Sequence, residues 1–312
     1  GKEPDAPQHF GFDEACLWQH TRRPSRYKNP GFEINGKPVD YSSGEYGPDI
    51  INDYACEFMQ RHQDEPFFLY YSMMLTHDPF QPVPGSPDWD KPLEEGKAAN
   101  DPKYFPGMVA YMDRLVGRIV ETVNELELSE NTLILFAGDN GTNKKITSML
   151  NGREVQGGKF ETTDTGTHVP LIVSWPDTAP QGQVCSDLID FSDFLPTLCE
   201  AAGASIPSKL PIDGISFLPQ IKGQPGSPRE AIFAWYVPKN ADAAKAKEWA
   251  RDKRYKLYAN GKFYNVEADP LEESPLTLSS LSAEAATAHE KLQNLLAQYK
   301  NALPESAKSS RP

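Results

Sequence analysis

The sequence predicts an α/β fold: a mainly parallel sheet with helices on both faces, followed by a smaller antiparallel sheet and a helix. Two observations support this prediction. Up to about residue 224, short apolar runs alternate with amphipathic helical patterns, as in chains whose buried parallel sheet is covered by helices. After residue 224 the pattern changes to short strands joined by tight turns. We therefore predict an α/β domain over 1–224 and an antiparallel α+β subdomain over 225–312.

The helices are predicted from apolar residues that recur every three or four positions. A helix starting at Pro48 runs to about His62, with Ile50, Tyr54 and Phe58 on one face. A longer amphipathic helix spans 108–123, and a third spans 191–202. Cys56 and Cys199 fall within these patterns as small core residues.

Three short apolar runs predict buried strands over 67–75, 131–137 and 169–175. Two stretches carry no sustained period: residues 1–47, which we expect to form shaped loops with short elements, and the proline-rich stretch 78–103.

The sequence pattern of the C-terminal part differs from that of residues 1–224. Short strands are predicted over 231–236, 254–258 and 262–266, the last two joined by a turn that contains Asn260-Gly261. A helix is predicted over 283–301.

Composition excludes several classes of protein. Of the 312 residues, 38% are hydrophobic, which is enough to build a core. No apolar stretch approaches the length of a membrane span. The net charge of −13 argues against a nucleic-acid partner, so an anionic substrate would need a local cluster of cations. The four cysteines include no CxxC pair, which argues against a zinc ribbon and leaves disulfides open.

Two predicted strands end in residues that can carry chemistry. His77 follows strand 67–75, and Asp139-Asn140 follows strand 131–137 between two glycines. In an open α/β sheet, ligands gather at such strand ends. The oxygens of Asp139 and Asn140 suit a hard cation such as Ca²⁺ or Mg²⁺. Alternatively, Asp-Asn-Gly is an ordinary turn, and His77 buttresses the loop that follows it.

Two further segments carry positive charge. Lys159 follows Gly157-Gly158, a pair that permits close backbone approach. The lysine offers a point charge for an oxyanion, with a solvated surface lysine as the alternative. The segment 20–28 is the strongest basic and aromatic cluster of the chain. Its Arg22 and Arg23 are candidates to contact sulfate groups on a sugar, with a solvated loop as the alternative.

Taken together, these segments resemble the sulfatase family in order and spacing over nearly the whole chain. The matching segments are Phe10-Gly11-Phe12-Asp13, Thr76-His77-Asp78-Pro79, Asp113-Arg114, Gly138-Asp139-Asn140-Gly141, Gly157-Gly158-Lys159, Gly166-Thr167-His168-Val169-Pro170, Asp193-Phe194-Leu195-Pro196-Thr197, Asp213-Gly214, Arg254-Tyr255-Lys256-Leu257 and Phe263-Tyr264-Asn265 through Asp269-Pro270.

The resemblance implies an alkaline-phosphatase-like fold and hydrolysis of sulfate esters by a formylglycine bound to a divalent cation. The cation is usually Ca²⁺, with Mg²⁺ as the alternative. By motif, Asp139 and Asn140 would be metal ligands. His77 would contact the sulfate or protonate the leaving oxygen, and Lys159 would neutralise sulfate charge. The family also suggests a periplasmic or secreted protein.

This chain departs from the family pattern in several places. None of its cysteines lies in the C/S-x-P-x-R motif that yields formylglycine, and Arg22 stands where Cys or Ser would precede Pro24. The family's early Asp-Asp metal pair and its Gly-Lys-Trp-x-Leu-Gly segment are absent. His168 replaces a common arginine. We therefore expect the C-terminal portion of a sulfatase, with the formylglycine outside this chain and no turnover by the chain alone.

Two alternatives stay open on the sequence. One is a phosphoryl or phosphonate hydrolase of the same superfamily. The other is a non-catalytic relative that binds anionic glycans. Within the sulfatase reading, the basic and aromatic cluster favours a sulfated carbohydrate as substrate over a small aryl sulfate.

Overall fold

The computed structural model describes residues 5–19, 22, 24–91, 100–209, 211–238 and 245–302. The chain divides into two compact units, residues 1–132 (unit 1) and 133–312 (unit 2). The boundary predicted near residue 224 falls inside unit 2, between α6 (Leu218–Ile221) and β8 (Ile232–Tyr236).

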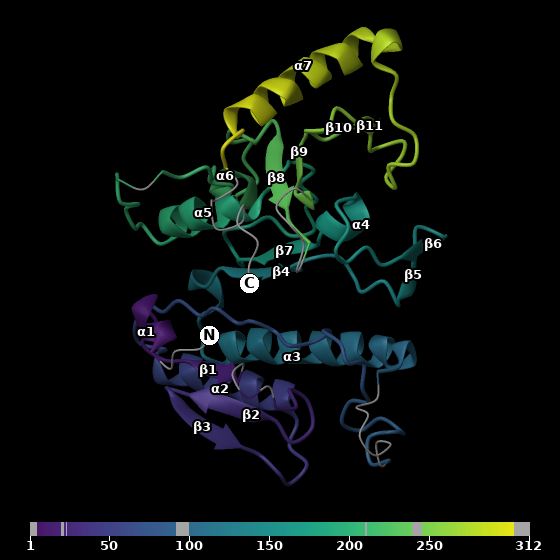
Figure 1. The fold of residues 1–312 in the computed structure, drawn as a ribbon. Coiled ribbons are helices and arrows are strands. Elements are labelled where there is room, and N and C mark those ends of the chain that lie inside the picture. The colour runs from purple at the N-terminus through teal and green to yellow at the C-terminus, as the bar shows by residue number, and fades with distance from the viewer. Residues whose placement is uncertain are drawn as a thin grey trace. The chain divides into compact units, whose positions relative to one another are not determined.

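Unit 1 contains a small antiparallel sheet and two packed helices (Figure 1). The sheet has the strand order β1-β2-β3, and α2 packs against α3. Its described elements are α1 (Ala6–His9), β1 (Cys16–Trp18), β2 (Gly31–Ile34), β3 (Lys37–Asp40), α2 (Gly47–Arg61), η1 (Pro102–Tyr104), α3 (Phe105–Glu125) and η2 (Ser129–Asn131).

The two predicted helices of unit 1 are confirmed as α2 and α3. Each has a proline in its first turn, where the missing N–H would be unpaired in any case. Their apolar faces bury Met59, Met108 and Leu115, each at most 2% exposed. The buried Asn52 of α2 donates from Nδ2 to the carbonyl of Leu115, at 3.0 Å, and so ties α2 to α3.

One predicted strand of unit 1 was wrong. Residues 67–75 form no strand, because the described part of the chain offers them no hydrogen-bonded neighbour. Phe68 and Tyr70 are 60% and 71% exposed, so the apolar run is not buried on both faces. The segment 1–47, which we expected to form shaped loops with short elements, holds the short strands β1–β3. The Asn35-Gly36 turn, with positive φ at both residues, joins β2 to β3 and is a hairpin signal that the sequence displays.

Unit 2 contains three separate sheets among its described residues. β4 pairs with β7, β5 pairs with β6, and the third sheet has the order β11-β10-β9-β8. The elements are β4 (Ile134–Ala137), β5 (Thr147–Leu150), β6 (Arg153–Gln156), α4 (Asp164–Thr167), β7 (Leu171–Ser174), η3 (Phe191–Asp193), α5 (Phe194–Ala201), α6, β8, β9 (Lys247–Arg251), β10 (Tyr255–Tyr258), β11 (Phe263–Asn265), η5 (Leu278–Ser280) and α7 (Ala283–Gln298).

The α/β class and the C-terminal antiparallel sheet with its helix are confirmed. Parallel pairing is not seen, because every ladder among the described residues is antiparallel. β4 and β7, for example, run in opposite directions, with Ile134 opposite Ser174. The chain between them folds as the β5–β6 hairpin and the short helix α4, not as a crossover helix of the kind that parallel strands need.

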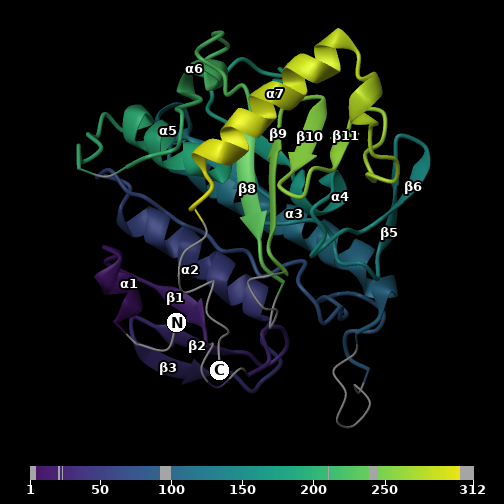
Figure 2. The same ribbon diagram turned by 45° about the horizontal axis from the view of Figure 1, so that its top comes forward.

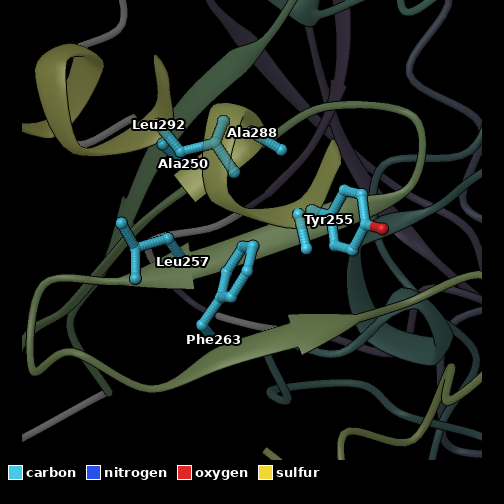
Figure 3. Packing of buried hydrophobic residues seen from close by; sticks show 7 residues of the cluster. Ala250, Tyr255, Leu257, Phe263, Ala288 and Leu292 are labelled. Atoms are coloured by element: carbon cyan, nitrogen blue, oxygen red, sulfur yellow. The ribbon is translucent and has the colours of Figure 1, made fainter. Parts of the chain in front are cut away.

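The C-terminal sheet is covered on one face by α7 (Figure 2). Alternate residues of β9, β10 and β11 point toward the helix and form an apolar cluster with it (Figure 3). This cluster consists of Ala250, Tyr255, Leu257, Phe263, Ala285, Ala288 and Leu292. The opposite face of the sheet therefore carries the intervening residues, among them Trp249, Arg251, Lys256 and Tyr258.

Candidate functional site

In unit 1, His77 lies in the turn that follows residues 67–75. Its side chain is 45% exposed. The Nδ1 atom lies 2.6 Å from the main-chain oxygen of Asp78. A carbonyl oxygen can only accept, so Nδ1 carries the hydrogen and Nε2 is the atom free to exchange a proton. The local geometry therefore suits a proton donor that acts through Nε2.

Tyr27 is hydrogen-bonded to the backbone of this turn. Its side chain is buried, and its hydroxyl donates to the carbonyl oxygens of His77 and, at 3.3 Å, of Met74. Burial raises the pKa of Tyr27, so the hydroxyl stays a donor at neutral pH. Sequence reasoning missed this residue, since a single Tyr in an irregular segment gives no signal of a contact about fifty residues away.

In unit 2, Asp139 and Asn140 follow the end of β4, as predicted. Asp139 is exposed and Asn140 is half-buried. Neither side chain has a hydrogen-bond or ion-pair partner among the described residues, so their oxygens are free to bind a cation.

The loop after β4 and the loop that carries Lys159 lie side by side. The N–H of Lys159 donates to the carbonyl of Thr142 at 2.9 Å, and the N–H of Gly157 donates to Ile146 at 2.8 Å. The predicted metal ligands and the predicted sulfate-binding lysine therefore belong to one packed region of unit 2.

Glycines make this close packing feasible. A β-carbon on Gly141 would come within 2.0 Å of the carbonyl oxygen of Thr165, and one on Gly158 within 2.2 Å of the Thr165 hydroxyl. A β-carbon on Gly166 would come within 2.2 Å of the carbonyl oxygen of Glu161. These positions need glycine because backbone segments touch there, with no room for any side chain.

Lys159 itself lies at the second position of a four-residue turn. The N–H of Glu161 donates to the carbonyl of Gly158 at 2.7 Å and closes the turn. The Lys159 side chain is half-buried, and its ammonium lies 5.6 Å from the centroid of the Phe160 ring. No carboxylate within the described residues pairs with this ammonium, which leaves it available to an anion.

The basic and aromatic cluster of unit 1 is in part internally paired. Arg22 donates to Gln19 and Asp40, and its side chain is still 55% exposed. Arg23 lies outside the described residues. The cations of Arg26 and Lys28 each lie 4.5 Å from the ring centroid of a tryptophan, Trp18 and Trp89 respectively.

The structure thus places the loop of Asp139 and Asn140 next to the turn of Lys159 within unit 2, while His77 and Arg22 belong to unit 1. Asp139 and Asn140 offer two oxygen ligands, and a hard cation needs about six. In the described part of the chain, no group of three or more His, Cys, Asp or Glu side chains gathers in a way that could hold a metal ion.

All four cysteines lie in the described part of the chain and are free thiols. No helix there is long and apolar enough to cross a membrane.

In this α/β fold, the loop of Asp139 and Asn140 lies next to the turn that carries the unpaired Lys159. The sequence profile of the sulfatase family matches residues 2–204, and that of the "N-sulphoglucosamine sulphohydrolase, C-terminal" family matches residues 159–302. The chain belongs to the sulfatase family.

Curated relatives agree with this assignment. The chain is 31% identical over 231 residues to the uncharacterized sulfatase YdeN of Escherichia coli (strain K12), a match that covers 73% of this chain and 40% of the relative. It is 30% identical over 200 residues to human arylsulfatase A, which covers 64% of this chain and 36% of that enzyme. The chain thus spans less than half the length of these relatives.

Solved structures share the fold. A crystal structure of Ps i-CgsB in complex with k-i-k-neocarrahexaose superposes with a TM-score of 0.77 at 23% identity, covering all of this chain and 71% of that one. The structure of BT4656 in complex with D-glucosamine-2-N,6-O-disulfate gives 0.71 at 19% identity, covering 93% of this chain and 77% of the other. The fold is therefore the alkaline-phosphatase-like fold of sulfatases.

Proposed function

We propose that this chain supplies the cation-binding and anion-binding part of a sulfatase that hydrolyses sulfate esters of a carbohydrate. The observation that carries the proposal is the backbone hydrogen bond from Lys159 to Thr142, which holds the lysine turn against the loop of Asp139 and Asn140. Family membership supports the reaction class, and the two carbohydrate-bound neighbours support the substrate class.

Asp139 and Asn140 would hold one side of a Ca²⁺ ion, or of Mg²⁺ in its place. When bound, such a cation neutralises charge on sulfate oxygens and on the nucleophile. Lys159 would add a second positive charge for the sulfate group. By resemblance to the family, His77 would donate the proton to the leaving oxygen. Its Nε2 is the atom that could do so, because Nδ1 is already hydrogen-bonded to Asp78.

The nucleophile is proposed to be a formylglycine outside these 312 residues, since no C/S-x-P-x-R motif occurs within them. The isolated chain should then turn over no sulfate ester even with calcium present. Turnover that scales with the amount of this chain, and that is lost in His77→Ala, would show that the nucleophile lies within it.

The metal assignment is tested by Asp139→Ala in the full-length protein. We expect loss of calcium-dependent sulfatase activity and of calcium binding measured by titration calorimetry, with unchanged thermal unfolding. Asp113→Ala, at an exposed position of α3, is the matched control and should keep both. Normal calcium affinity in Asp139→Ala would overturn the assignment. Sulfated-glycan binding without any turnover by the wild-type protein would favour the non-catalytic relative.

A further inference from the structure

The turn that carries Lys159 is strained at its third position. Phe160 has φ of 75°, a backbone conformation that crowds the β-carbon and that bulky residues rarely adopt. Its ring is 61% exposed, so burial of the ring does not offset the cost. Strain of this kind persists only where the surrounding structure holds the backbone on both sides. On the N-terminal side, the packed glycines Gly157 and Gly158 do so.

On the C-terminal side, the anchor is Thr162, which is only 3% exposed. The ammonium of Lys256 on β10 donates to the main-chain carbonyl of Thr162. The hydroxyl of Tyr258, two residues further along β10, lies 2.8 Å from the hydroxyl oxygen of Thr162. Both the backbone and the side chain of Thr162 are therefore fixed by one strand.

Lys256 is fully buried, which is unusual for a lysine. Its ammonium lies 2.7 Å from the Glu272 carboxylate, itself 5% exposed in its side chain. It also lies 5.1 Å and 5.0 Å from the ring centroids of Trp249 and Tyr258. The charge is thus paired with a carboxylate and two aromatic faces while one donor reaches the carbonyl of Thr162.

A second contact from the same face of the sheet reaches the next turn of the loop. Arg251 of β9 donates to Asp164 at 2.5 Å, where α4 begins. Because successive residues of a strand point to opposite faces, β9 and β10 pack against α7 with one set of side chains and hold residues 162–164 with the other.

We propose that Lys256 is a positioning residue of the sulfatase site, which acts by tethering Thr162 and thereby holding Lys159 in its strained turn. This rests on the proposed role of Lys159 in binding the sulfate group. A well-packed apolar pair in place of a buried Lys–Glu pair is often neutral or stabilising, so stability alone does not explain an ammonium here. The hydrogen bond to the main-chain carbonyl of Thr162 explains the ammonium, because no apolar residue can donate such a bond.

The first test needs no catalysis and uses the 312-residue chain. The double variant Lys256→Met with Glu272→Gln removes the tether without leaving an unpaired buried charge. Hydrogen exchange of the amides of residues 159–164 should accelerate about tenfold or more relative to the rest of unit 2. The matched control is Arg229→Met with Asp193→Asn, a pair of comparable burial that contacts no residue of this loop. Unchanged exchange at 159–164, or equal acceleration in the control, would overturn the proposal.

The second test is a double-mutant cycle on kcat/KM in the full-length protein. Loss of the tether should lower kcat/KM on the order of 10- to 100-fold. Once Lys159→Ala is present, the same double variant should lower it no further, because it acts only through Lys159. Additive effects would show a merely structural role. If Lys159→Ala has no effect on its own while exchange at 159–164 still accelerates, the tether stands and the proposed function fails.

Discussion

The buried hydroxyl of Tyr27 donates to the main-chain carbonyl of His77, which lies fifty residues further along the chain. It ties the segment before β2 to the turn that carries the candidate proton donor. The bond fixes the backbone of that turn and does not involve the imidazole, whose Nδ1 is bonded to Asp78.

Tyr27→Phe removes this donor and leaves the carbonyl of His77 without it. We expect a loss of about 1–3 kcal/mol in the free energy of unfolding, measured by urea denaturation followed by fluorescence. Tyr41→Phe is the control, because the hydroxyl of Tyr41 has no hydrogen-bond partner among the described residues. Equal stability of the two variants would mean that the bond to His77 contributes nothing.

Stability should also depend on the protonation of His62. Its side-chain hydrogen bond to Glu65, followed by that to Glu14, raises the pKa of His62 above 6.5. A raised pKa in the folded state stabilises the protein fully below the unfolded value and loses that contribution as pH rises through the folded value. The free energy of unfolding should therefore decline as pH rises from about 6.5. In His62→Gln this decline should disappear, and an identical profile in both proteins would contradict the prediction.

Gly141→Ala should be strongly destabilising. The new β-carbon would lie 2.0 Å from a backbone oxygen, so either the Asp139 loop or the Thr165 segment must move, at a cost of about 3 kcal/mol. Gly117→Ala in α3 is the control, since nothing lies within 4 Å of its β-carbon and helix propensity favours alanine by about 0.5–1 kcal/mol. Thermal unfolding should thus shift in opposite directions for the two variants.

Arg22→Ala combined with Arg23→Ala tests the predicted contact with a sulfated carbohydrate. In the full-length protein we expect a higher KM for sulfated oligosaccharides and little change for a small aryl sulfate, which lacks the distant sulfates that such arginines would bind. Arg254→Ala removes an exposed, ion-paired arginine that directly precedes β10 and is the control. Unaltered turnover of oligosaccharides would remove this segment from the substrate site.

The sequence predicts the elements whose signal is local. The periods over 48–62 and 108–123 match α2 and α3, and the strands after residue 230 are found almost as expected. The strand predicted over 67–75 fails because an apolar run cannot reveal whether a pairing partner exists. β9 was missed, since its residues mix charged and apolar types and show no clean alternation.

For the candidate site, local motifs located Asp139, Asn140 and Lys159, and the structure shows their loops to be neighbours. The supporting residues could not be found in this way. In the sequence, Lys256 looks like any charged residue of a strand. Only the tertiary fold shows that its ammonium is buried against a loop about ninety residues earlier. Long-range hydrogen bonds of this kind leave no periodic trace.

The alternation of side chains in β10 has a consequence for how the C-terminal sheet assembles. A slip of one residue in its pairing would turn Lys256 into the apolar layer beneath α7 and bring Tyr255 and Leu257 to the loop side. The misaligned sheet would bury a cation without a partner, a far heavier penalty than the loss of a few apolar contacts. The same ammonium that anchors Thr162 therefore also specifies the register of the sheet, because it disfavours the alignment shifted by one residue.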